Sequence, residues 1–154
     1  MIRRAQAKDI DEILIIEKQS FPVAWEYTEF LNICLLRGKT ASKSIGIVYM
    51  DVLEQGGRIV GYVVWEIDTK KDMGHILNIA VQQNERRKGN GKMLLLHVVQ
   101  HLKSHNVSSC RLEVRESNLP ARTLYEANGF IATSKIYGYY FDEDAIVYTL
   151  SIQS

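Results

Sequence analysis

The chain has 154 residues, the length of one domain, and 46% of them are hydrophobic while 24% are charged, which is typical of a soluble globular protein. Nineteen basic and eighteen acidic residues leave a formal charge of +1. This balance argues against a protein that coats nucleic acid or binds membranes through a polybasic surface, and we expect neither partner. No apolar stretch approaches the roughly 20 residues that a membrane-spanning helix needs.

The N-terminal segment and the cysteines indicate a cytoplasmic protein. Residues 1–12 include basic side chains but no apolar segment behind them, so we expect no secretory signal. Cys34 and Cys110 are far apart and form no CxxC or Cys/His pattern, so we expect reduced thiols and no structural zinc. Without repeats or proline-rich linkers, residues 1–154 are predicted to form a single domain.

The first third of the chain is predicted to form a short strand followed by two helices. The strand covers Ile2 to Arg4. Apolar residues at helical spacing predict a helix from Lys8 to Ser20, which ends there because the residue before Pro22 is disfavoured in the α conformation. A second helix is expected over Tyr27 to Leu36, with Gly38 as its C-terminal stop.

The pattern then changes to alternating, β-branched segments. A hairpin is expected from Ser44 to Leu53 and from Arg58 to Ile67, joined by a glycine turn. Gly74 to Val81 is a third strong strand, and a polar, basic loop connects it to a helix from about Gly89 to Ser104. The remaining segments alternate as strand, helix, strand and strand, over Ser109–Arg115, Asn118–Asn128, Phe130–Tyr137 and Ala145–Ile152. Seven strands and four helices favour a mixed sheet with helices on its faces.

The basic loop before the helix at Gly89 is the most informative segment. Glu85 to Lys92 contains four positive charges and one negative charge, and Gly89 and Gly91 lie where the helix begins. Glycines allow a ligand to approach the backbone, and the first turn of a helix favours an anion, so the loop suits a pyrophosphate. The alternative is a basic turn capped by glycines. Met93 after Lys92 excludes a Walker P-loop, and the missing third glycine excludes a dinucleotide-binding fingerprint.

The loop Arg86-Arg-Lys-Gly-Asn-Gly91 resembles the acetyl-CoA loop of the GNAT acyltransferase superfamily, Gln/Arg-x-x-Gly-x-Gly/Ala. The segment LEVRESN at 112–118, with Ala121, LYE at 124–126 and GF at 129–130, looks like the LEVRxSN…A…LYExxGF block of its N-terminal acetyltransferase branch. That branch includes bacterial ribosomal-protein-alanine and archaeal protein N-terminal acetyltransferases. Residues 137–145 and 20–25 are similar to its YY…(E)DA and FP…W loops. The four motifs occur in the family's order and cover nearly the whole chain.

The resemblance implies a GNAT fold of the α/β (α+β) class: a seven-stranded, mostly antiparallel sheet with helices on both faces and a V-shaped splay between strands 4 and 5. The family's acetyl-CoA lies in that splay and leaves as CoA. The positions that match its cofactor contacts are Ile79, Ala80, Val81, Arg86, Arg87, Lys88, Gly89, Asn90, Gly91, Lys92, Asn118 and Tyr125.

The resemblance further implies acetyl transfer to the α-amine of a polypeptide by direct attack in a ternary complex. Arg111, Glu113 and Arg115 alternate with apolar residues and therefore share one face of their strand. The family's matching glutamate is a proposed general base, so Glu113 is the candidate base, and the alternative is a solvated strand face. His75 shares a strand face with Leu77 and Ile79 unless a bulge intervenes, and it is either a partner of Glu113 or a structural histidine. Tyr125 is the candidate acid, and it also suits a core position.

Phe21, Pro22, Trp25, Tyr139 and Tyr140 are predicted to bind the peptide substrate, together with Tyr137. The expected substrate is a peptide or protein N-terminus, such as that of a ribosomal protein or a nascent chain, and the protein is expected to be a monomer or weak dimer. Two alternatives stay open. One is a GNAT enzyme for a lysine side chain or a small-molecule amine, and the other is a non-catalytic acyl-CoA-binding subunit.

Three further features carry weaker signals. His97, His101 and His105 recur at helical spacing that could bind a metal, but an exposed helix flank is the favoured interpretation, and we expect no required metal. The acidic run Asp142 to Asp144 is expected to be a solvated loop beside the substrate mouth. Neither cysteine is a nucleophile candidate, because direct attack by the amine needs no acyl-enzyme.

Overall fold

The structure, a computed structural model, describes residues 1–35, 39–41 and 46–153. Among these the strands are β1 (Ile2–Arg4), β2 (Lys39–Ala41), β3 (Gly46–Gln55), β4 (Arg58–Asp68), β5 (Met73–Val81), β6 (Ser109–Arg115), β7 (Ile131–Ile136) and β8 (Ala145–Ser151). The helices are α1 (Ile10–Ser20), α2 (Tyr27–Leu35), α3 (Asn90–Ser104) and α4 (Leu119–Ala127), with short 3-10 turns η1 (Ala7–Asp9) and η2 (Gln83–Glu85). No described helix is long and apolar enough to cross a membrane.

The seven predicted strands form one continuous sheet in the order β1-β3-β4-β5-β6-β8-β7. All neighbours on this path are antiparallel except β5 and β6. An additional short strand, β2, pairs with β3 and was not predicted, because three residues are too few to show an alternating pattern. The predicted ends at Leu36 and Gly38, and the predicted strand start at Ser44, lie outside the described residues.

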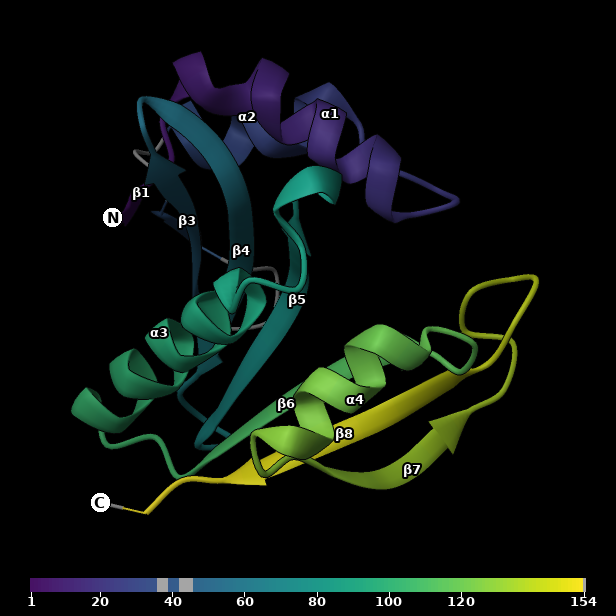
Figure 1. The fold of residues 1–154 in the computed structure, drawn as a ribbon. Helices are drawn as coiled ribbons and strands as arrows, with labels where there is room; N and C mark the ends of the chain where they lie inside the picture. Colours follow the sequence, from purple (N-terminus) through teal and green to yellow (C-terminus); the bar gives the residue numbers. More distant parts are fainter. Residues whose placement is uncertain (36–38, 42–45, 154) are drawn as a thin grey trace.

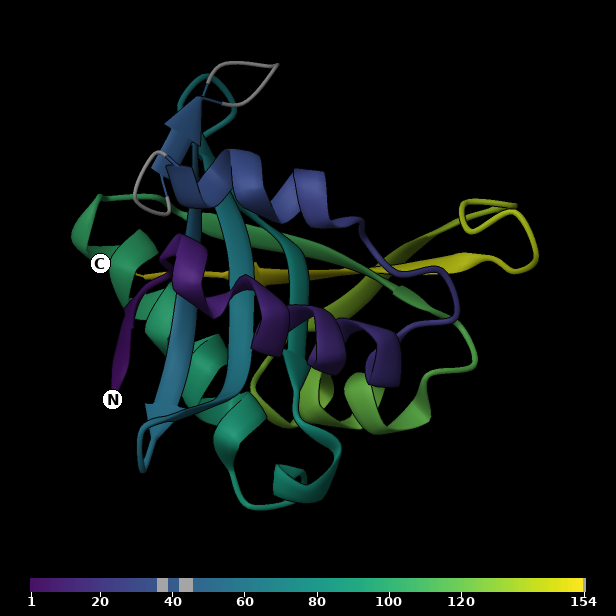
Figure 2. The ribbon, with the colours of Figure 1, turned by 90° about the horizontal axis from the view of Figure 1, so that it is seen from above.

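Two hydrophobic cores lie on opposite faces of the sheet, and each is covered by its own pair of helices (Figures 1 and 2). Helices α1 and α2 contribute residues such as Ile13 and Phe30 to one core. Helices α3 and α4 contribute residues such as Leu94 and Tyr125 to the other. The prediction of helices on both faces is therefore confirmed.

The predicted splay is present between β5 and β6, the fourth and fifth strands of the predicted set. Their parallel pairing runs only from Met73 opposite Ser109 to Ile76 opposite Leu112. Beyond these residues β5 continues to Val81 and β6 to Arg115 without pairing to each other, and the two ribbons diverge (Figure 1). Backbone groups on the inner edges of the V are therefore free of that ladder and available to a ligand.

A β-bulge in β5 changes which side chains share a face. The register shifts where Val64 faces Asn78 but the next residue of β4, Trp65, faces Ile76, which leaves Leu77 as an extra residue. Leu77 packs with the core of α1 and α2, whereas Ile79 packs with the core of α3 and α4. His75 therefore shares a face with Leu77 but not with Ile79, which corrects the expectation for an unbulged strand.

Candidate active site

A cavity of about 590 Å³ opens at the splay. Its walls come from the end of β5, the basic loop, the start of α3 and one side of α4. The lining residues are Ser20, Phe21, Ile79, Ala80, Val81, Gln83, Arg86, Arg87, Gly89, Gly91, Lys92, Asn118, Pro120, Ala121, Leu124 and Tyr125. Ten of the twelve predicted cofactor residues are in this set. Segments distant in sequence thus meet in one cavity.

The basic loop is held in a fixed conformation by its own side chains. Arg86 donates from Nε to the Val81 carbonyl at 2.9 Å and from a terminal nitrogen to Ser20 Oγ at 2.9 Å. Gly89 caps α3 with φ of +85°, a left-handed conformation in which a side chain is strained. Lys88 and Asn90 do not line the cavity: Lys88 pairs with Glu85 at 3.3 Å, and the buried Asn90 amide donates to the Glu85 carbonyl at 2.9 Å.

The cavity chemistry fits a phosphate-bearing cofactor such as acetyl-CoA. A Cβ on Gly89 would meet no atom within 4 Å, so the backbone there faces open space. The first turn of the 15-residue helix α3 begins beside it, and helix N-termini favour anions. Arg87 and Lys92 add positive charge to the lining. The opposite wall, with Leu124 and Ala121, is apolar and suits the uncharged arm of such a molecule.

Helix α4 places Asn118 and Tyr125 at this cavity. Asn118 is the N-cap of the helix, and its side chain accepts a hydrogen bond from Ala121 N at 3.2 Å. Tyr125, two turns further on, is only 5% exposed and packs against Phe130 and Tyr148. Burial, together with nearby Tyr140, raises the pKa of its hydroxyl well above the ordinary value, so that the hydroxyl remains protonated at neutral pH. Tyr125 is thus both a core residue and a cavity residue.

His75 and Glu113 meet on the face of the sheet that carries α1 and α2. Their closest atoms, His75 Nε2 and Glu113 Oε2, are 2.6 Å apart. Glu113 is the first residue of β6 beyond the paired segment, so it stands at the base of the V. Its side chain is 8% exposed, which argues against the alternative of a solvated strand face. The alternation of Arg111, Glu113 and Arg115 with apolar residues is confirmed.

Two other charged side chains complete this cluster. Glu66 Oε1 lies 3.6 Å from His75 Nδ1, so the imidazole has a carboxylate on each side. Arg111 Nε lies 3.3 Å from Glu113 Oε1. Arg111 was predicted on the face of Glu113 without a role. Glu66 was not predicted, although it lies directly opposite His75 in the β4–β5 register.

The predicted aromatic residues border the site from two loops. Phe21 lines the cavity, Trp25 packs against Phe30 with ring centroids 5.4 Å apart, and Pro22 is exposed between them. In the loop between β7 and β8, the rings of Tyr139 and Tyr140 pack edge to face, with their centroids 4.9 Å apart. Tyr137, by contrast, is 79% exposed.

The acidic run Asp142 to Asp144 was expected to be solvated, but its side chains form ion pairs. Asp142 and Glu143 both pair with Arg115, at 2.9 and 3.2 Å, and Asp144 pairs with Lys135 at 3.6 Å. The Arg115 guanidinium also stacks over the Tyr140 ring at 4.5 Å. The run therefore ties the aromatic loop to β6, close to Glu113.

A buried polar cluster that was not predicted connects the loop between α1 and α2 to β5. Glu17 of α1 is 1% exposed and accepts hydrogen bonds from the Trp25 backbone N–H at 2.9 Å and the Asn78 amide at 2.8 Å. The Tyr62 hydroxyl donates to the same carboxylate. Burial raises the Glu17 pKa, while the hydrogen bonds from Trp25 and Asn78 oppose the rise. Glu17 thus fixes the loop before α2 against the bulge of β5. The sequence feature that could have indicated this cluster is a glutamate on the apolar stripe of α1.

The remaining histidines and both cysteines have structural surroundings. His97 Nε2 contacts the buried Asp51 carboxylate at 3.0 Å, and its ring lies 4.5 Å from that of His101. Within the described residues no three His, Cys, Asp or Glu side chains are grouped to hold a metal ion. Burial raises the pKa of the Cys34 thiol to about 11 and that of Cys110 to about 12, so neither is a thiolate at neutral pH.

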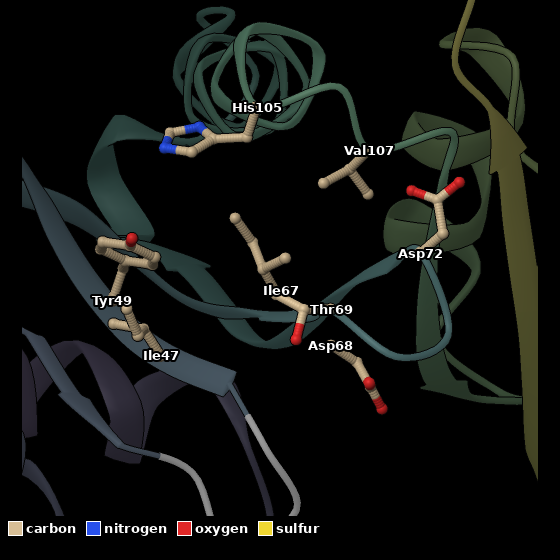
Figure 3. A pocket seen from close by; sticks show the side chains of 8 residues that line it. All are labelled: Ile47, Tyr49, Ile67, Asp68, Thr69, Asp72, His105 and Val107. Atoms are coloured by element: carbon tan, nitrogen blue, oxygen red, sulfur yellow. The ribbon is translucent and has the colours of Figure 1, made fainter.

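A second cavity, of about 260 Å³, lies near the C-terminal end of α3 (Figure 3). Its lining includes His105, Val107 and Ile67. Its carboxylates already have partners, because Asp68 accepts hydrogen bonds from two backbone N–H groups and Asp72 accepts one from Ser108 Oγ. This cavity contains none of the predicted site residues.

Comparison with known proteins agrees with this geometry. The chain is 31% identical to an N-alpha-acetyltransferase of Saccharolobus solfataricus, over 94% of this chain and 88% of the relative. It is 30% identical to the [ribosomal protein bS18]-alanine N-acetyltransferase of Salmonella typhimurium, over 93% and 99% of the two chains.

Solved structures show the same fold. The Ard1 structure from Thermoplasma volcanium has a TM-score of 0.86 at 25% identity, covering 100% of this chain and 98% of that one. The ribosomal-protein-S18-alanine N-acetyltransferase of Escherichia coli has a TM-score of 0.82 at 27% identity, covering 100% and 94%. The sequence pattern of the acetyltransferase (GNAT) family matches residues 10–130. With the splayed sheet and the glycine-rich basic loop in place, the chain belongs to the GNAT family of acetyltransferases.

Proposed function

We propose that this protein transfers the acetyl group of acetyl-CoA to the free α-amine of a polypeptide N-terminus. The observation that carries the proposal is the His75–Glu113 contact at the base of the V, where β5 leads into a cavity suited to acetyl-CoA. The full-length similarity to N-alpha-acetyltransferases supports the same substrate class. Amine and acetyl donor would approach the V from opposite faces of the sheet.

Acetyl-CoA would supply a thioester whose acetyl group is activated for attack by an amine. The cavity residues from Arg86 to Lys92 would hold its pyrophosphate through backbone N–H groups and positive charge. Asn118 would lie beside its uncharged arm. Backbone N–H groups between Ile79 and Val81, on the unpaired edge of β5, would stabilise the negative charge that develops on the acetyl oxygen.

Glu113 would act as the general base, directly or through a water molecule. An α-amine has an ordinary pKa of about 7.7–8.0 and must lose a proton before it attacks. His75 Nε2, 2.6 Å from Glu113 Oε2, can exchange that proton with the carboxylate. Glu66 lies on the other side of the imidazole, with its Oε1 3.6 Å from His75 Nδ1. The three groups then form a route for the proton across β6, β5 and β4.

Tyr125 would protonate the departing CoA thiolate. A tyrosine hydroxyl, with an ordinary pKa of about 10, is already protonated at neutral pH. Burial raises the pKa of Tyr125 further, so its proton would move only as negative charge develops on the sulfur. The two cysteines remain protonated and buried, which favours direct attack in a ternary complex over an acyl-enzyme. Free buried cysteines also suit action in the cytoplasm. The similarity to a ribosomal-protein-alanine N-acetyltransferase supports ribosomal proteins or nascent chains as substrates.

CoA release measured with three substrate classes tests the proposal. The first class is short peptides with a free N-terminus, which should be acetylated. The second class is peptides whose α-amine is blocked and which carry an internal lysine, and these should not be acetylated. Polyamines and other small amines form the third class. Preference for the blocked lysine peptide or for free amines would assign the protein to another acetyltransferase class. Binding of acetyl-CoA without turnover on any amine would favour a non-catalytic subunit.

A further inference from the structure

Arg111 occupies a place from which it can contact a substrate bound at Glu113. It lies two residues before Glu113 on β6 and on the same face of the strand. In the sheet register it is opposite His75 of β5 and Thr149 of β8. Tyr139 lies near as well: burial raises the pKa of its hydroxyl, Glu113 adds to the rise, and the positive charge of Arg111 opposes it. Arg111 is thus part of the surface that surrounds the proposed base.

The guanidinium of Arg111 is only partly engaged by the protein. Its Nε is buried and lies 3.3 Å from Glu113 Oε1, yet it has no well-aligned hydrogen-bond partner among the described residues. The side chain as a whole is nevertheless 39% exposed. The Nε side of the guanidinium therefore faces Glu113 without forming an aligned hydrogen bond. The exposed part of the side chain can bind a ligand. A planar guanidinium in this state is suited to a carboxylate.

Arg111 can pair with a second carboxylate beside Glu113. Its guanidinium offers several N–H donors in one plane, and its contact with Glu113, at 3.3 Å, is made from Nε. A substrate carboxylate can therefore pair with the exposed part of the guanidinium. In an N-terminal Asp or Glu residue, the α-ammonium is attached to the same Cα as the side chain that ends in the carboxylate. Such a residue can place its ammonium on Glu113 and its carboxylate on Arg111, so that the four charges alternate in sign.

We propose that Arg111 forms a carboxylate subsite that favours peptides whose first residue is Asp or Glu. The inference rests on the proposed N-terminal acetyltransferase function and names the substrate class of that site. Glu66 also carries negative charge in this region, but it lies on β4, across the His75 ring from β6. A substrate carboxylate bound at Arg111 would therefore lie next to the guanidinium. The His75 imidazole would separate that carboxylate from Glu66.

Two peptides that are identical except for a first residue of Glu or Gln test the subsite. The measured quantity is the ratio of their kcat/KM values. Wild-type protein should prefer the Glu peptide by at least about tenfold, the factor that one charge-assisted hydrogen bond contributes. The preference should fall as salt is raised, because the subsite is partly exposed. A variant that disturbs Glu113 changes kcat/KM for both peptides, so the ratio of the two values is insensitive to that disturbance.

Three variants make the test specific. Arg111→Gln should abolish the preference, and Arg111→Lys should retain part of it because the positive charge remains. Arg58→Gln removes an exposed arginine at the start of β4 and should leave the ratio unchanged. Equal rates with both peptides in the wild type, or an unchanged ratio in Arg111→Gln, would overturn the subsite while leaving the proposed function intact. If the wild type acetylated neither peptide, the proposed function would fail, and the subsite with it.

Discussion

Replacing Glu113 by Gln should reduce turnover far more than it reduces stability. Gln keeps the size of the side chain and one acceptor oxygen but cannot take a proton from an amine. Loss of a general base typically costs about 10²–10⁴-fold in rate. For stability, the change weakens the 2.6 Å contact with His75 and the 3.3 Å ion pair with Arg111. Two such contacts in a side chain with 8% exposure correspond to about 1–3 kcal/mol, or a fall of several degrees in Tm.

The assay pairs kcat/KM for a peptide with a thermal melt of each variant. His75→Gln and the double variant complete a cycle: if the two residues share one proton route, the double variant should lose much less than the product of the single losses. Asp11→Asn, which removes an exposed carboxylate of α1, serves as the charge control. A folded Glu113→Gln protein with wild-type kcat/KM at all pH values would refute the assignment of the base.

Three further changes test other parts of the account. Tyr125→Phe keeps the packing with Phe130 and Tyr148, so it should preserve Tm and acetyl-CoA binding but lower kcat. The loss should be smaller than for Glu113→Gln, since a thiol with an ordinary pKa of about 8.5 is a tolerable leaving group; unchanged turnover across pH would leave Tyr125 a core residue only. Gly91→Leu should raise the KM for acetyl-CoA, because the new side chain enters the cavity wall beside Leu124; equal affinity by calorimetry would contradict the loop assignment. For Asp51, burial favours a higher pKa, but hydrogen bonds from His97 and Trp65 and the charge of Arg4 hold the pKa below 3.8. The ionised form therefore stabilises the fold above that pH and loses its effect as pH falls through the lower folded value. Asp51→Asn should lower urea stability at pH 7, and the difference from wild type should shrink at pH 3; a constant difference would contradict this.

Local sequence patterns predicted most of the sheet because its strands have strong alternation. In β6, every second residue is apolar and buried, so the shared face of Arg111 and Glu113 followed from parity alone. The glycines at 89 and 91 likewise marked the start of α3. Such features depend on residues close together in the chain.

Features that depend on distant residues were not predictable in this way. The bulge at Leu77 arises in the pairing of β5 with β4, and nothing in its own sequence marks it. The burial of Glu113 requires His75 from β5 and the loop that Arg115 ties to β6. Glu17 gains its role only when α1 packs against the sheet and meets Tyr62 and Asn78.

The most direct test of the central claim is to locate the transferred acetyl group. The wild-type protein is incubated with acetyl-CoA and a peptide that carries both a free α-amine and an internal lysine, and the product is analysed by tandem mass spectrometry. We predict a single added acetyl group on the α-amine, which accumulates about 10²–10⁴-fold more slowly when Glu113→Gln replaces the wild type. Acetylation of the lysine side chain in preference to the α-amine would contradict the proposed function.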